Sequence, residues 1–122
     1  MTLVELLPAL RNTSSDRTTR GLIELFEGWR TNGSTADELR QSVDRYIGNT
    51  WIANDEVHKK VNALWSAFRD ECIYGRRGMT MNERLYCFDL LDAWDNAKTE
   101  EDRAVVRRKV DFEAYEEGVQ AS

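Results

Sequence analysis

The chain has 122 residues, of which 41% are hydrophobic and 32% charged, a composition that is typical of one folded domain over residues 1–122 and argues against a disordered protein. Its formal net charge of −5 disfavours nucleic acid and anionic membranes as partners, because phosphate binding relies on clustered Lys and Arg. No apolar run approaches the about 18 residues of a membrane-spanning helix and the N-terminus has no basic lead, so we expect a cytoplasmic protein.

The N-terminal part of the chain predicts three helices. Thr2 and Glu5 are spaced as a capping box for a short first helix. Pro8 should shorten or kink this helix, so residues 1–12 are open to loose ordering. Two longer helices are expected between the polar connection at residues 12–15 and the stop signal at 32–33, and between the caps at 34–37 and the stop signal at 48–49.

The next segment predicts a bridge, a long helix and a turn. We expect Trp51, in the bridge at residues 50–52, to lie in the core. Asn54 is a suitable cap for the fourth helix. Its apolar stripe is Val57, Val61, Leu64, Trp65, Phe68 and Cys72. The glycines of GRRG then end the helix, and we expect Arg76 and Arg77 to form an exposed basic turn, with anion binding as the less favoured alternative.

The most apolar helical run in the chain covers residues 80–97. Thr80 and Glu83 form a capping box, so a helix is expected to start there and to continue unbroken and centrally among the others. Its predicted buried face is Tyr86, Cys87, Leu90, Leu91, Ala93, Trp94 and Ala97. A last helix follows the cap pair Thr99 and Asp102, with Val105, Val106 and Val110 directed inward.

The pattern as a whole is helical. Strand-type alternation is missing from the sequence, and the helices are joined by short turns. We therefore predict an all-α fold, a compact single-domain bundle of about six short helices, with residues 117–122 also open to loose ordering.

Residues suited to catalysis or metal binding are few. His58, the only histidine, is expected to be a solvated surface residue, and Cys72 and Cys87 to be reduced core thiols. The chain has no phosphate-binding glycine loop and no common metal-ligand spacing. We expect no enzyme activity, no cofactor and no metal.

The main functional indication is an acidic strip on the helix expected at residues 80–97. Like charges three residues apart on a helix repel, so repeating them lowers the stability of the helix slightly. The fold itself does not require this repetition. The strip is either a solvated face or a docking surface on which carboxylates attract a basic partner while Phe88 or Leu85 supplies an apolar anchor. The predicted partner-binding residues are Leu85, Phe88, Asp89, Asp92 and Asp95, with Glu24 and Glu27 as a weaker second patch.

The stretch NERLYCFDLLDAWDNA resembles the pattern NERLxxxxLLDxxDxA of short, uncharacterised proteobacterial proteins, for which no activity is settled. In type, the small acidic helical chain also resembles the immunity proteins of bacterial toxin-immunity systems, especially those of contact-dependent growth inhibition. That resemblance implies tight binding to a toxin domain, commonly a basic nuclease.

We therefore expect a non-catalytic protein that neutralises a basic toxin domain by complementary charge and a few buried aromatic residues. A phage-type acidic inhibitor of a host nuclease is a related alternative. From a different class, a structural or regulatory module could self-associate through Phe88, Trp94 or Tyr115. The free protein is expected to be a monomer or a weak homodimer.

Overall fold

The computed structural model describes residues 1–50 and 54–111, which form seven α-helices and contain no strand. The helices are α1 (Leu3–Thr13), α2 (Arg17–Trp29), α3 (Ala36–Asn49), α4 (Asp55–Phe68), α5 (Met81–Cys87), α6 (Leu91–Asn96) and α7 (Glu100–Val110). A π turn at Arg69–Ile73 and a 3₁₀ turn at Tyr74–Gly78 continue α4 toward α5. The predicted all-α, compact bundle is confirmed, whereas Trp51, Tyr115 and residues 117–122 lie outside the described residues.

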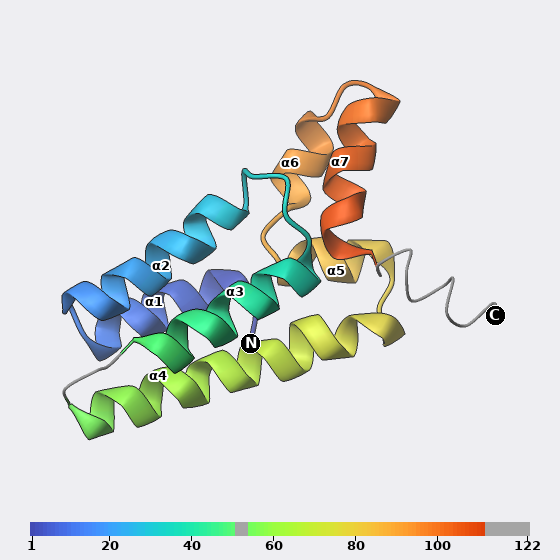
Figure 1. Cartoon of the computed structure of the whole chain (residues 1–122). Coiled ribbons are helices and arrows are strands. Elements are labelled where there is room, and N and C mark those ends of the chain that lie inside the picture. The colour runs from blue at the N-terminus through green and yellow to red at the C-terminus, as the bar shows by residue number, and fades with distance from the viewer. Residues whose placement is uncertain (51–53, 112–122) are drawn as a thin grey trace.

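The helices fall into two regions. Helices α1 to α4 run side by side and form what we call the body (Figure 1). Helices α6 and α7 form a hairpin that projects from one end of the body, with α5 at the junction (Figure 1). Each described residue that the sequence offers for function therefore belongs to the body, to the hairpin or to this junction.

An aromatic cluster fills the centre of the body and receives one side chain from the junction. Phe26 contacts Trp65 and Phe68 with ring centroids 5.7 and 6.1 Å apart. Phe88, which follows α5, packs between Phe68 at 5.6 Å and Trp29 at 5.3 Å. Aromatic pairs at these separations are favourable beyond the area that they bury. Phe88 thus joins the junction to the core.

The first helix is continuous through Pro8. Leu3, Leu6 and Leu10 repeat at helical spacing and are fully buried against the other helices of the body. The segment at residues 1–12, for which loose ordering was expected, therefore contributes to the core. Pro8 lies on the exposed face of α1, where the carbonyl freed by its missing amide can be hydrated. Position on the helix therefore decides the effect of this proline.

The expected unbroken helix over residues 80–97 is wrong, because the chain turns between α5 and α6. Asp89 has a left-handed backbone with a φ of 58°. The amide of Leu90 donates to the carbonyl of Leu85 at 2.8 Å, and that of Asp89 to the carbonyl of Tyr86 at 3.3 Å. These two bonds define a Schellman motif, which terminates a helix. A straight helix would place Leu85 and Phe88 opposite Leu90, so the turn allows all three to be buried.

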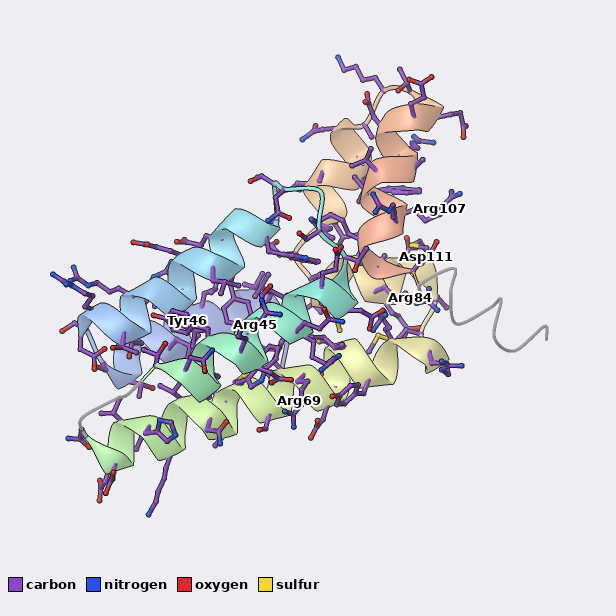
Figure 2. The ribbon with its side chains drawn as sticks, in the orientation of Figure 1. Arg45, Tyr46, Arg69, Arg84, Arg107 and Asp111 are labelled. Atoms are coloured by element: carbon purple, nitrogen blue, oxygen red, sulfur yellow. The ribbon has the colours of Figure 1, made fainter. Side chains whose placement is uncertain are left out.

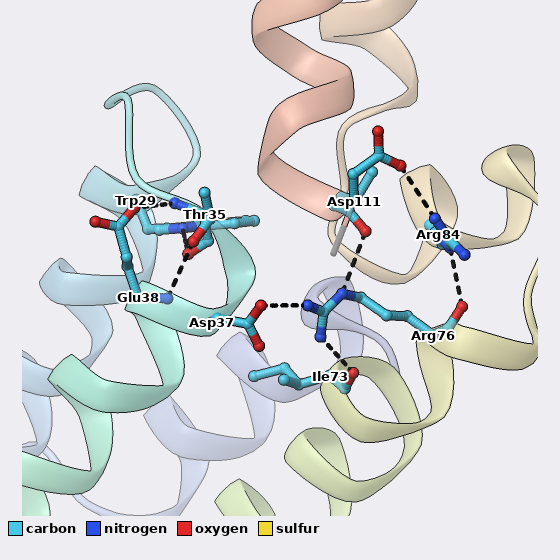
Figure 3. A network of polar contacts seen from close by, with 9 residues as sticks. Trp29, Thr35, Asp37, Glu38, Ile73, Arg76, Arg84 and Asp111 are labelled. Atoms are coloured by element: carbon cyan, nitrogen blue, oxygen red, sulfur yellow. Dashed lines mark hydrogen bonds and ion pairs between the residues drawn. The ribbon is translucent and has the colours of Figure 1, made fainter. Parts of the chain in front are cut away.

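The GRRG turn connects three other segments through the buried side chain of Arg76. The exposed position predicted for Arg76 is therefore wrong. The Arg76 guanidinium is 2% exposed and donates to Asp37 of α3, to the carbonyl of Ile73 and to the carbonyl of Val110 in α7 at 2.6, 2.6 and 3.2 Å (Figure 3). Arg84 donates to the carbonyl of Arg76 at 2.9 Å (Figure 3). The turn therefore ties α3, α5 and the end of α7 together.

A buried lysine attaches the hairpin to the body. Lys109 of α7 is 3% exposed, and its ammonium donates to the carbonyls of Trp29, Asn32 and Ser34 at 2.5, 2.6 and 2.9 Å. It also lies 4.2 Å from the centroid of the Trp29 ring. A cation at the end of a helix satisfies its free carbonyls, so Lys109 caps the C-terminus of α2.

Candidate binding groove beside α5 and α6

Because the chain turns at Asp89, the predicted site residues lie in different environments. Leu85 and Phe88 are fully buried, so neither can supply the exposed anchor predicted for them. The Asp89 carboxylate forms an ion pair with Arg30, which directly follows α2. Asp92 and Asp95 are exposed on α6. The acidic strip therefore does not exist as one continuous surface.

The second predicted patch has mixed charge. Glu24 and Glu27 line an open hollow of about 300 Å³ together with Arg11 and Arg20. Glu27 accepts a hydrogen bond from Arg11 at 2.9 Å. Two arginines offset the two carboxylates, so this surface has little net attraction for a basic partner.

A larger hollow of about 570 Å³ opens beside the junction, and we call it the groove. It is lined by Thr2, Glu71, Met79, Asn82, Glu83, Tyr86, Cys87 and Leu91. Tyr86 and Leu91 are 62% and 37% exposed, although the straight helix predicted them to be buried. An exposed aromatic and an exposed leucine beside a hollow are suitable anchors for a partner's side chains.

The groove is acidic. Glu83 lines it, and hydrogen bonds from the amide and hydroxyl of Thr80 lower the pKa of this carboxyl. Glu71 lines it as well, in an ion pair with the α-amino group of Met1. The exposed Asp92 follows Leu91 directly. Glu83 and Asp92 thus place carboxylates beside the apolar anchors, which favours a basic ligand, whereas the charge of Glu71 is offset by the α-amino group of Met1.

Sulfur atoms line the inner side of the groove. Cys72 and Cys87 are free thiols, 0% and 5% exposed. Their sulfurs and one carboxylate oxygen of Glu71 all lie within 4.8 Å of one another. The Cys87 sulfur is 3.9 Å from the Met79 sulfur. The hydrogen bond between the two thiols, reinforced by burial, raises the pKa of Cys72, and the same bond lowers the pKa of Cys87.

The histidine and the thiols lie far apart. His58 is half-buried near the start of α4, and Cys72 follows it by fourteen residues along the same helical rod. At 1.5 Å per residue the two are about 20 Å apart. A Cys-His pair, the arrangement most easily imagined for catalysis here, is therefore not assembled.

Sequence reasoning missed the groove because its residues come from four separated places in the chain. The one available signal was the combination of Leu85, Phe88 and Leu90 on different sides of one expected helix, since a single helix cannot bury all three fully. Breaking that helix after Phe88 would have directed attention to Tyr86 and Leu91.

Comparison of the chain with protein-family models, with curated proteins and with solved structures found no match in any of the three. The resemblances proposed from the sequence therefore stay predictions. No described helix is long and apolar enough to cross a membrane.

Proposed function

We propose that this chain is a non-catalytic binding protein that docks a basic protein partner in the groove, in the manner of an immunity protein that neutralises a toxin domain. One observation carries the proposal: the exposed side chains of Tyr86 and Leu91 border a hollow of about 570 Å³ that is lined by Glu71 and Glu83. Apolar anchors surrounded by charge are the usual composition of a protein interface.

The chemistry of the groove favours a protein over other ligands. Its acidic rim opposes phosphate groups, and the formal net charge of −5 extends that opposition over the whole chain. A basic toxin domain instead meets complementary charge, which accelerates association, and Tyr86 supplies area that can be desolvated. We expect the complex to cover the partner's substrate-binding surface and so to block it.

Affinity capture from the source cells, at low and at high salt, tests the proposal. We expect a basic protein to be retained, its retention to fall with salt and with Asp92→Lys, and to be lost with Tyr86→Ala. The matched control is Glu24→Lys with Glu27→Lys on the mixed-charge hollow, which should leave capture intact. Expression of the captured protein should be toxic, and co-expression of this chain should relieve the toxicity.

Three results would overturn the proposal. The first is recovery of this chain alone, which would indicate self-association. The second is a partner whose capture is indifferent to Tyr86→Ala, since the groove would then not be the interface. The third is a partner that shows no toxicity when it is expressed.

A further inference from the structure

We propose that Cys72, Cys87 and Met79 form a binding site for one soft monovalent metal ion, for which copper(I) is the biological candidate. The inference goes beyond the proposed docking function and rests on a different property of the groove, the sulfur atoms at its inner side. Cys87 and Met79 line the groove directly, and Cys72 lies behind them.

The spacing of the sulfur atoms suits a shared ion. A thiolate bound to a first-row metal lies about 2.3 Å from it, so two such sulfurs are about 4.0 Å apart at a trigonal angle and about 3.8 Å at a tetrahedral one. The sulfurs of Cys87 and Met79 are 3.9 Å apart. The Cys72 sulfur lies within 4.8 Å of the Cys87 sulfur, so Cys87 lies near both other sulfurs and is the centre of the proposed three-sulfur set.

The kind of ligand selects the ion. Thiolate and thioether sulfurs are soft ligands that favour copper(I), whereas structural zinc sites are built from four cysteine or histidine ligands. His58 is the only histidine and lies about 20 Å away along α4. The carboxylate of Glu71 is the hard ligand within reach, and it is engaged by the α-amino group of Met1.

Binding needs only an exchange of ions. Cys72 and Cys87 each lose the proton of the thiol, the two thiolates and the Met79 thioether bind one copper(I), and two protons leave to solvent. No electron is transferred. One of the two protons released is the thiol proton that Cys72 donates to the carbonyl oxygen of Met1 at 3.2 Å, and the groove gives an ion access to Cys87.

The test is an anaerobic competition between the full chain and a chromogenic copper(I) chelator, with ascorbate as the reductant. We expect one equivalent of copper to be retained by the wild type, and to be lost in Cys72→Ser and in Cys87→Ser. X-ray absorption of the loaded protein should show sulfur scatterers alone. Circular dichroism of each variant establishes that it is folded.

Replacing each of two methionines by leucine gives a matched pair of variants, because leucine preserves the packing at both positions. Met79→Leu should weaken copper(I) binding by about tenfold or more, and Met81→Leu, on α5 but outside the sulfur set, should not change it. Transfer of all the copper from folded wild type to the chelator would overturn the inference. So would equal binding by the Met79→Leu and Met81→Leu variants, or tighter retention of zinc that depends on Glu71. None of these results bears on capture of a protein partner through Tyr86.

Discussion

The body is held together by a large apolar core, whereas the hairpin contributes only Val106 and Val110 of α7 to that core and relies in addition on polar contacts. In the body, the helices pack around the contacting rings of Phe26, Trp65 and Phe68. In the hairpin every residue of α6 keeps some exposed surface. Its Trp94 is covered by two arginines of α7, Arg103 and Arg107, whose guanidinium carbons lie 5.5 and 5.6 Å from the ring centroid.

The difference indicates that the two regions have different local stabilities. A region with few buried apolar contacts opens at a lower free energy than one with a large core. The attachments of the hairpin include Phe88, Lys109 and the bond from Arg76 to the carbonyl of Val110. They also include the ion pair of Arg84 with Asp111 at 3.1 Å (Figures 2 and 3). Substitutions at these attachments should therefore separate the two regions experimentally.

The largest effect is expected where the two regions share a side chain. Phe88→Ala removes a fully buried ring from contact with Trp29 and Phe68, so it should lower the free energy of unfolding by about 3–5 kcal/mol. Urea denaturation measures this, with Leu91→Ala on the exposed side of the junction as a control of small effect. A loss below about 1 kcal/mol would place Phe88 outside the core.

Lys109→Met should cost less, about 2 kcal/mol, because it leaves the carbonyls at the end of α2 without their donor. Burial lowers the pKa of Lys109 to about 8. Between about pH 8 and 10.5 the unfolded chain holds a proton that the folded chain has lost, so folding of the wild type is favoured as pH rises. The difference in unfolding free energy between wild type and Lys109→Met should therefore increase over this interval. A constant difference would mean that Lys109 titrates normally.

At the turn between α5 and α6, Asp89→Gly and Asp89→Ala form an informative pair. Both remove the ion pair with Arg30, but only alanine retains the cost of a left-handed backbone. The glycine variant should be more stable than the alanine variant by about 1 kcal/mol. Thermal unfolding of the two proteins is a sufficient measurement, and equal stability would contradict the left-handed conformation.

The smallest effect on stability should come from the arginines over Trp94. Arg107→Ala removes one cation–π contact, which is worth about 0.5–1 kcal/mol at such a site. We expect faster amide hydrogen exchange in α6 and α7 and unchanged exchange in α1 to α4. Arg108→Ala, another exposed arginine of α7, is the control. Faster exchange throughout the molecule would mean that the two regions open as one unit.

The body could be predicted from the sequence because its signals are local. The capping boxes Thr2 with Glu5 and Thr80 with Glu83 mark helix starts, and both are present. The third helix is capped by Thr35 with Glu38, one residue later than predicted. In α1 and α3 a regular apolar stripe identifies the buried face, whereas the face predicted for the helix from Thr80 included Tyr86 and Leu91, which are exposed.

The junction and the groove could not be predicted in the same way. Helix ends of the Schellman type usually carry glycine, and an aspartate at position 89 gives a weaker signal. Arg76 looks like a solvated charge until Asp37 and the end of α7, distant in sequence, surround it. The sulfur set likewise depends on the contact of α5 with the turn that follows α4. Contacts between distant segments decide these features, and local patterns indicate them only weakly.

The left-handed residue at Asp89 also bears on the order of folding. Residues 80–97 have the local preferences of one straight helix, and the bend exists because Phe88 and Leu90 gain burial against the body. Local and tertiary preferences are therefore in conflict at this point, which is a form of frustration. The nascent segment should first be a straight amphipathic helix, and it should bend only after the aromatic core has assembled to receive Phe88.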